Sequence, residues 1–283
     1  MGEENTLLHI RGVFPTLRPA EQRVAREILK NPEEAVHLSI TELGRRAEVS
    51  DATVVKFCKR LGYKGFQEFK ILLAQDVATK PEPIYGEIEP GDDAAAVRDK
   101  IFQSNIQALQ DTAQTLSEES LAEAVQALVA ASEIHFYGLG ASGLVAQDAE
   151  QKFARIGLPA RSFVDAHMQL TRAALLKPGD VAVGISYSGE TIEVAQAIAL
   201  AKESGAVTIG ITNFPKSRIA QLCDIVLLTA AQENVFRSGA ISSRIAQLST
   251  VDALFISAAL EDYERSQECI ERTRAAVASR KQA

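Results

Sequence analysis

The sequence predicts two domains of different class: a small all-α bundle followed by an α/β domain with a parallel sheet and helices on both of its faces. The length of 283 residues is enough for two domains of ordinary size. Residues 18–77 show helical periodicity and no strand pattern. Beyond residue 133, short apolar runs rich in β-branched residues alternate with helical stretches, as in a parallel sheet built from crossover units.

Stop signals divide the N-terminal part into short helices. Pro19–Lys30 fits a helix that ends at Asn31 and Pro32, and three more helices are expected up to Val77. Thr79–Asp92 then contains three prolines and two glycines, which is typical of a linker. The predicted organisation is a helical domain over residues 1–78, a linker over 79–92, and an α/β domain with flanking helices over 93–283.

The second domain opens with a helical pattern from Ala94 to Ser132. Five apolar runs follow as expected strands: IHFYGLG, ARSFV, VAVGIS, AVTIGIT and DIVLL, at residues 134–140, 160–164, 181–186, 206–212 and 224–228. The stretches between them are helical in pattern, as the crossovers between parallel strands require. The charged stretch after Glu261 is expected to be helical and to pack on the domain or on a partner chain.

Composition excludes several classes of protein. Hydrophobic residues make up 46% and charged residues 24%, which indicates a globular chain. No apolar run approaches the roughly 18 residues of a membrane helix, and the N-terminus lacks the order of a signal peptide, so we expect a cytoplasmic protein without membrane contact. Cys58, Cys223 and Cys269 are odd in number and far apart, which argues against disulfides and gives no support for a zinc site. We expect no metal or cofactor.

The charge is divided unevenly along the chain. The net charge is −7, yet residues 1–80 carry 13 Lys and Arg against 11 Asp and Glu, and residues 81–283 carry 17 against 26. Within the first part, Ala52–Gln67 contains four basic residues and no acid. A small basic face on an acidic protein favours contact with DNA over charge spread for solubility.

Residues 39–62, SITELGRRAEVSDATVVKFCKRLG, predict a helix, a tight turn at Glu48–Ser50 and a second helix. Ser50 is a good N-cap residue, and Gly62 ends the second helix. A helical wheel places four apolar residues on its inner side: Val54, Phe57, Cys58 and Leu61. The outer side is basic, which is the chemistry of a recognition helix in a helix-turn-helix motif.

The residues expected to contact DNA are Ser50, Thr53, Lys56, Lys59, Arg60 and Lys64. The first three can meet base edges or nearby phosphates, and the last three can neutralise backbone phosphates. The alternative is an ordinary amphipathic helix with lysines in water. The acid-free stretch and the tight turn favour DNA binding.

Two loops rich in glycine and serine follow expected strands, GLGASG at residues 138–143 and SYSGET at 186–191, and each opens a helix. Ligands of open α/β sheets bind at the carboxyl ends of strands, where free N–H groups attract anions. The loops therefore predict one phosphate site. Ser186, Ser188 and Thr191 would hold phosphate oxygens, and Ser142 would hold a phosphate oxygen or a sugar hydroxyl.

Other interpretations of these loops remain open. Gly138, Gly140 and Gly143 also satisfy the dinucleotide pattern G-x-G-x-x-G, and Asp165 stands where a ribose-binding acid is expected. An NAD(H)-sensing regulator is therefore an alternative, although SYSGET has no part in such a site. A further alternative is that both loops are plain turns.

With these motifs, the sequence resembles the RpiR family of bacterial transcriptional regulators, which join a helix-turn-helix domain to a sugar-isomerase (SIS) domain. Residues 39–70, 136–142, 185–191 and 236–248 carry the resemblance, in the order of the family. It implies a DNA-binding regulator of carbohydrate metabolism rather than an enzyme. The implied partners are a double-stranded DNA operator, a phosphorylated sugar or sugar acid, and further copies of the chain in a homodimer or homotetramer.

The resemblance also implies individual site residues. Thr53 and Lys56 match DNA-contacting positions of the family. The expected ligand-binding residues are Gly140, Ser142, His167, Ser186, Tyr187, Ser188, Gly189 and Thr191. His167 is equally consistent with a capped or core histidine. Glu233, Arg237 and Arg244 could reach sugar hydroxyls or a carboxylate, or could form salt bridges at an interface.

An enzyme is the rival from another class, namely a sugar-phosphate isomerase with a helical extension. Such chemistry needs a general base beside the substrate. The visible candidates are Glu150, Glu190, Glu233 and His167, and none has a distinctive partner in the sequence.

Overall fold

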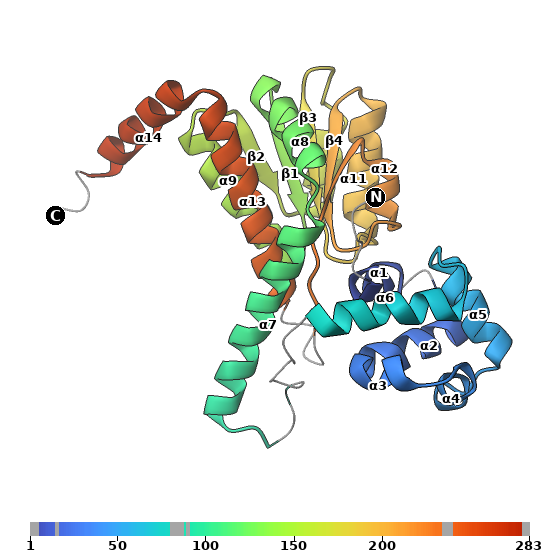
Figure 1. The fold of residues 1–283 in the computed structure, drawn as a ribbon. Helices are drawn as coiled ribbons and strands as arrows, with labels where there is room; N and C mark the ends of the chain where they lie inside the picture. Colours follow the sequence, from blue (N-terminus) through green and yellow to red (C-terminus); the bar gives the residue numbers. More distant parts are fainter. Residues whose placement is uncertain (1–5, 15–16, 80–87, 89–90, 234–239, 279–283) are drawn as a thin grey trace. The chain divides into compact units, whose positions relative to one another are not determined.

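The computed structural model describes residues 6–14, 17–79, 88, 91–233 and 240–278. The chain falls into two compact units, Met1–Gly86 and Glu87–Ala283, which Figure 1 shows and which are described separately below. Among the described helices, none is both long and apolar enough to cross a bilayer.

The first unit is all-α, as predicted. Its helices are α1 (Thr6–Val13), α2 (Pro19–Lys30), α3 (Pro32–His37), α4 (Ile40–Arg46), α5 (Asp51–Arg60) and α6 (Phe66–Thr79). Asn31 ends α2 and caps α3 by accepting a hydrogen bond from Glu34 N. Helix α1 was not predicted, and its Ile10 is fully buried in the core with Val24, Ile28 and Phe57.

Close backbone contact shapes the turn between α4 and α5. A Cβ on Gly44 would lie 3.0 Å from the carbonyl oxygen of Val49, so a side chain here would require the backbone of the turn to shift by a few tenths of an ångström. Glu48 takes a positive φ of 52°, which is costly for a residue with a side chain. Arg23 of α2 supports the turn, since its guanidinium donates to the carbonyls of Ala47 and Glu48.

The second unit is the predicted α/β domain. Its strands are β1 (Ile134–Gly138), β2 (Ala160–Phe163), β3 (Val181–Ile185), β4 (Val207–Thr212) and β5 (Ile225–Leu228). Its helices are α7 (Ala94–Thr115), α8 (Glu118–Ala130), α9 (Gly140–Arg155), α10 (Ala166–Ala173), α11 (Ile192–Glu203), α12 (Arg218–Leu222), α13 (Ser242–Glu261) and α14 (Tyr263–Ala278). The helical pattern of residues 94–132 is two helices, because Ser117 caps α8 by accepting from Ser120 N.

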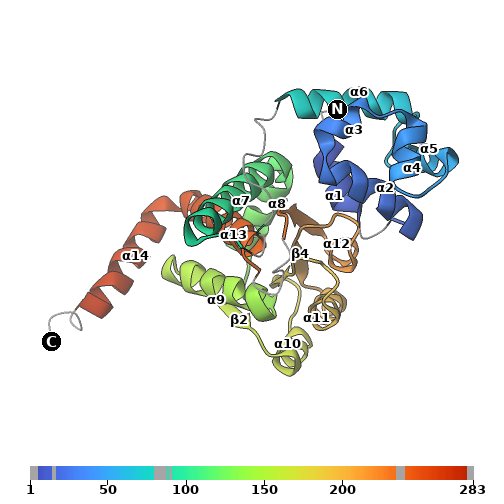
Figure 2. The same cartoon turned by 90° about the horizontal axis from the view of Figure 1, so that it is seen from below.

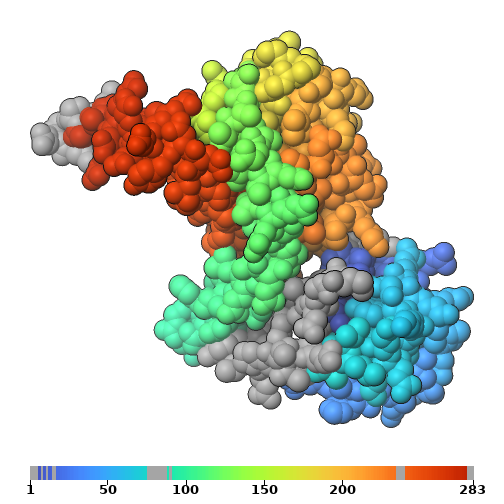
Figure 3. Space-filling model, turned by 45° about the horizontal axis from the view of Figure 1, so that its top comes forward, coloured from blue at the N-terminus to red at the C-terminus, as the bar shows by residue number. Residues whose placement is uncertain are grey.

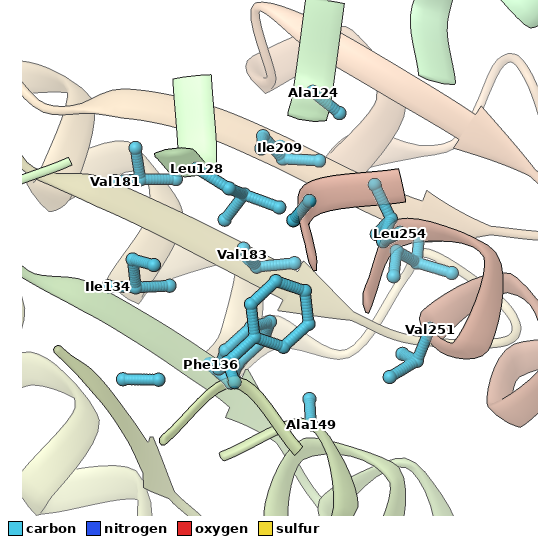
Figure 4. Packing of buried hydrophobic residues seen from close by; sticks show 14 of the residues in the cluster. Ala124, Leu128, Ile134, Phe136, Ala149, Val181, Val183, Ile209, Val251 and Leu254 are labelled. Carbon is cyan, nitrogen blue, oxygen red and sulfur yellow. The ribbon is translucent and has the colours of Figure 1, made fainter. Parts of the chain in front are cut away.

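The five strands are all parallel, in the order β2-β1-β3-β4-β5. Helices α8, α9 and α13 cover one face of the sheet, and α10, α11 and α12 cover the other, as Figure 2 shows. Alternate side chains of β1 divide between the faces: Ile134 and Phe136 join the first core, and Tyr137 joins the second. In Figure 4, Phe136 lies among the side chains of that first core, with Val183, Ala149 and Val251 around it.

The strand order reverses between β1 and β3. The chain leaves β1 through α9 toward β2, and leaves β3 through α11 toward β4, on the opposite face. Gly138 and Ile185, the last residues of these two strands, are paired in register. The two glycine/serine loops therefore start side by side at the switch point of the sheet, which is where open α/β sheets bind ligands.

Helix α14 leaves the body of the second unit. Figure 3 shows it in red, extending away from the rest of the α/β domain. Its first half packs, since Ser266 is buried and Cys269 lies against Gly157 at the end of α9. Residues 271–278 are all exposed.

Candidate functional site

Helix α5 is built as the sequence predicts for a recognition helix. Ser50 caps it by accepting from Thr53 N at 3.3 Å, and the hydroxyls of these two residues lie 3.0 Å apart. The predicted inner residues, Val54, Phe57, Cys58 and Leu61, are all buried. Burial raises the pKa of the Cys58 thiol to about 12, so it is a protonated core residue.

The basic residues of this region divide into two groups. The side chains of Lys56, Lys59 and Lys64 are exposed, as a phosphate-contacting surface requires. Arg60 is also exposed, but it pairs with the buried Glu21 of α2, at 3.0 Å between Nη1 and Oε2, whereas the ion pair of Lys64 with Glu68 is longer, at 4.0 Å. Because the Glu21 side chain is only 8% exposed, Arg60 has a role in holding α5 against α2. Its contact with DNA stays a prediction.

Both helices that open at the switch point begin without a side-chain cap. The N-cap residues are Leu139 for α9 and Thr191 for α11, and within the described part of the chain no side chain bonds to either first turn in the manner of a cap. By contrast, Asp165 caps α10 and Ser217 caps α12 at the same edge of the sheet. Uncapped N–H groups are positive and suit an anion.

The second loop is held together by its own hydroxyls. Ser186 is buried, and its Oγ accepts from Gly189 N at 3.1 Å and lies 2.9 Å from Thr191 Oγ1. Ser188 Oγ accepts from Glu190 N at 3.2 Å. Ser188 and Thr191 are half-buried, so their hydroxyls are more accessible than that of Ser186. Direct contact of Ser186 with phosphate stays a prediction.

Tight packing fixes the position of this loop. Gly189 has a φ of +65°, and a Cβ there would lie 2.0 Å from Ser217 Oγ. The hydroxyl of Tyr187 donates to the carbonyl of Ala231 at 3.2 Å. The backbone carbonyl of Tyr187 accepts from Asn213 N at 3.1 Å. The loop is thus preorganised by contacts within the protein that do not depend on a ligand.

The first loop needs glycine for a similar reason. A Cβ on Gly138 would lie 2.4 Å from the carbonyl oxygen of Ser142, and Gly140 has a φ of +55°. The side chain of Gln169, which is fully buried, donates to the carbonyls of Gly138 and Phe163. Ser142 Oγ donates to Oε1 of Gln247 at 3.2 Å. Sequence reasoning assigned no role to either glutamine, although Gln247 lies within segment 236–248.

The remaining predicted residues differ in exposure and in their hydrogen bonds. His167 is exposed on the first turn of α10, and Asp165, the candidate ribose ligand, accepts from Met168 N as an N-cap. Glu233 accepts from the backbone N–H groups of Ile241 and Ser243 at the start of α13. Arg244 is half-buried on α13. Arg237 lies outside the described residues, as do parts of the predicted linker and of segment 236–248.

Both predicted domains of the chain match known protein families. The helix-turn-helix domain of the rpiR family matches residues 4–80, and the SIS domain matches residues 127–257. An HTH-type transcriptional regulator of Caldanaerobacter subterraneus is 43% identical across 98% of both chains. The HTH-type regulator HexR of Pseudomonas aeruginosa is 37% identical, with 89% of this chain and 88% of HexR covered.

A solved structure is similar over the same length. It is that of the Vibrio vulnificus NanR protein complexed with ManNAc-6P, at 30% identity and a TM-score of 0.62, with 97% of this chain and 99% of NanR covered. The two matched domains occur in the predicted order, and the relatives span nearly the whole chain. This chain therefore belongs to the RpiR family of HTH-type transcriptional regulators, with an N-terminal helix-turn-helix domain and a C-terminal SIS domain.

Proposed function

We propose that the α/β unit binds a phosphorylated sugar or sugar acid and that this binding controls the affinity of the helix-turn-helix unit for an operator in carbohydrate metabolism. The observation that carries the proposal is the pair of uncapped helices, α9 and α11, at the switch point of the sheet. Hydroxyls of Ser142, Ser188 and Thr191 add neutral donors beside these N–H groups. Such a set binds a phosphate without a lysine or arginine.

The similarity to NanR favours this class of ligand, because NanR was solved with the sugar phosphate ManNAc-6P. Tyr187, Gly189 and Gly140 shape the two loops, and His167 stands at the carboxyl edge after β2. We assign the sugar moiety, rather than the phosphate, to His167 and to Glu233 or Arg244.

On the DNA side, α5 is the recognition helix. Lys56 and Lys59 are exposed on it, and Lys64 is exposed just beyond it. Helix-turn-helix proteins read two half-sites with two copies, so the regulator is a homodimer or homotetramer. We assign DNA binding to residues 1–78, the connection to 79–92, and ligand binding to 93–283.

Ligand occupancy would reach the connection through α7. This helix begins two residues after the proposed connection ends, and it packs against α13, where Ser104 Oγ lies 2.8 Å from Ser242 Oγ. A coupling free energy of about 1–3 kcal/mol, which is typical of allostery, changes operator affinity about 5–150-fold. The sign of the change depends on which arrangement the ligand prefers.

Two rivals have less support. The carboxylates of Glu150, Glu190 and Glu233 all accept hydrogen bonds from backbone N–H groups, which suits structural roles better than the general base of an isomerase. Two observations weaken the NAD(H) alternative. Asp165 already accepts a hydrogen bond as the N-cap of α10, and Gly138 is required by its close contact with the Ser142 carbonyl, without any need for a dinucleotide.

A ligand panel tests the proposal. Thermal shift and turnover are measured with ManNAc-6P, glucose 6-phosphate, fructose 6-phosphate, inorganic phosphate and NADH, followed by operator titration with each stabilising compound. We expect stabilisation by a sugar phosphate, no turnover, and altered operator affinity. Stabilisation by NADH alone, or isomerisation of a sugar phosphate, contradicts the proposal.

A further inference from the structure

Gln247 of α13 is a buried amide beside the first loop of the site. Gln247 is 1% exposed, and its Oε1 accepts a hydrogen bond from the Ser142 hydroxyl at 3.2 Å. Its Nε2 is buried and has no hydrogen-bond partner among the residues that the structure describes. Buried polar atoms are nearly always paired, because an unmade hydrogen bond is costly. An unused donor therefore lies next to a hydroxyl that the proposed function assigns to the ligand.

The two hydrogen-bonding roles of Ser142 conflict. A serine hydroxyl has one proton to donate and lone pairs with which to accept. A phosphate monoester near neutral pH presents acceptor oxygens and carries most of two negative charges. Ser142 therefore cannot donate to Gln247 and to a phosphate oxygen at the same time. It can, however, donate to phosphate while it accepts from an amide N–H.

We propose that Gln247 is a positioning residue for Ser142, and that its amide reverses when Ser142 donates to a phosphate oxygen. After a half-turn of the terminal amide, Nε2 donates to Ser142 Oγ and directs the serine proton toward the ligand. The inference rests on the proposed function and deepens it, because it names the residue that registers phosphate at the first loop.

The position of Gln247 gives the reversal a place in signalling. Gln247 lies on α13, five residues after Ser242, whose hydroxyl meets Ser104 of α7. Ser142, by contrast, lies on α9. The Ser142–Gln247 hydrogen bond therefore joins the loop that meets the ligand to the helix that packs on α7.

Side-chain amide NMR of the full-length protein tests the reversal. The Gln247 amide signals are assigned by their loss in Gln247→Met, and inorganic phosphate and ManNAc-6P are the probes. We expect the Gln247 amide protons to shift on titration of the wild type, and to stay in place in Ser142→Ala at saturating probe. The internal control is Gln169, whose buried Nε2 already donates to two carbonyls.

A double-mutant cycle provides the second measurement. An ionised glutamate at 247 only accepts, so it retains the Ser142 proton. In the wild type, Ser142→Ala should weaken probe binding about tenfold or more, the usual effect of removing a hydrogen bond to a charged group. In Gln247→Glu the same change should cost less than about twofold, whereas in Gln247→Met it should again cost about tenfold.

The outcomes separate the two proposals. If neither probe shifts any signal of the wild type, the phosphate site itself is wrong and the proposed function fails. If the probes bind, but the Gln247 amide does not respond or responds equally in Ser142→Ala, the reversal is wrong and the proposed function stands. Equal effects of Ser142→Ala in all three backgrounds lead to the same conclusion.

Discussion

The two units present their functional groups in opposite ways. In the helix-turn-helix unit, Lys56, Lys59 and Lys64 carry charge at the ends of long, exposed side chains. In the α/β unit, Ser186 and Thr191 carry short hydroxyls that already bond to each other. Exposed cations adapt to a phosphate backbone and are screened by salt, whereas preorganised donors lose little entropy on binding. Operator binding should therefore depend on ionic strength, and metabolite binding on backbone geometry.

The largest expected effect tests how tightly packing fixes the geometry of the second loop. Gly189→Ala places a Cβ 2.0 Å from Ser217 Oγ at a φ of +65°. We expect the free energy of unfolding of the α/β unit to fall by about 2–4 kcal/mol, from overpacking and left-handed strain together. Urea unfolding followed by circular dichroism measures it.

Gly140→Ala is the matched control for this prediction. Gly140 also has a positive φ, of +55°, but an added Cβ there meets no atom within 4 Å. Its substitution should cost only the backbone term of about 1–2 kcal/mol. Equal losses for the two variants would show that crowding against Ser217 does not fix the second loop.

The next effect concerns the hydroxyl at the centre of that loop. Ser186→Ala removes one of the two acceptors of Gly189 N, leaving the Ser186 carbonyl, and removes the partner of Thr191 Oγ1. We expect sugar-phosphate affinity to fall about tenfold or more, with operator affinity unchanged, by calorimetry and by DNA titration. Ser204→Ala, at the other end of α11, is the control. An unchanged effector response in Ser186→Ala would displace the phosphate from this loop.

A third comparison separates two basic residues of α5. Arg60→Ala leaves the buried Glu21 carboxylate without this partner, so the helix-turn-helix unit should lose about 1–2 kcal/mol of stability. Lys56→Ala should leave stability unchanged and reduce the slope of log affinity against log salt by about one. Lys30→Ala, an exposed lysine on α2, controls for loss of charge alone. Loss of folding in Lys56→Ala would make that lysine structural.

The smallest effect is a dependence of stability on pH. Burial lowers the pKa of His135 below 6.5, and this outweighs the attraction of Glu133, whose Oε1 lies 3.0 Å from Nε2. The unfolded chain therefore takes up a proton that the folded chain resists, so stability present above pH 6.5 is lost as the pH falls below it. His135→Asn should flatten this acid-side loss in thermal melts, and an unchanged loss in that variant would contradict the prediction.

Local signals in the sequence predicted most of the fold. The five strands and the bounds of α2 follow from apolar runs and from stop residues that act on their immediate neighbours. Helix α1 was not predicted because its sequence, TLLHIRGV, is short and has no acidic residue in its first turn. Asp165 misled for a related reason, since an N-cap aspartate and a ribose-binding one stand in the same place after a strand.

The supporting contacts of the sites could not be predicted in this way. Ser142 and Gln247 are separated by 105 positions, and Arg60 and Glu21 by 39. Gln247 lies in the second turn of α13, and although it falls within segment 236–248, nothing beside it in the sequence indicates Ser142 as its partner. Such pairs are brought together only when the helices pack, so one sequence contains no local trace of them.

The exposed end of α14 implies that local stability differs along the chain. Residues 271–278 are all exposed, so these last two turns are maintained mainly by their own backbone hydrogen bonds. A helical stretch of that length is marginal in water. Its amide hydrogens should exchange with deuterium at the earliest time points, whereas those of β1 and β3 should exchange only through global unfolding.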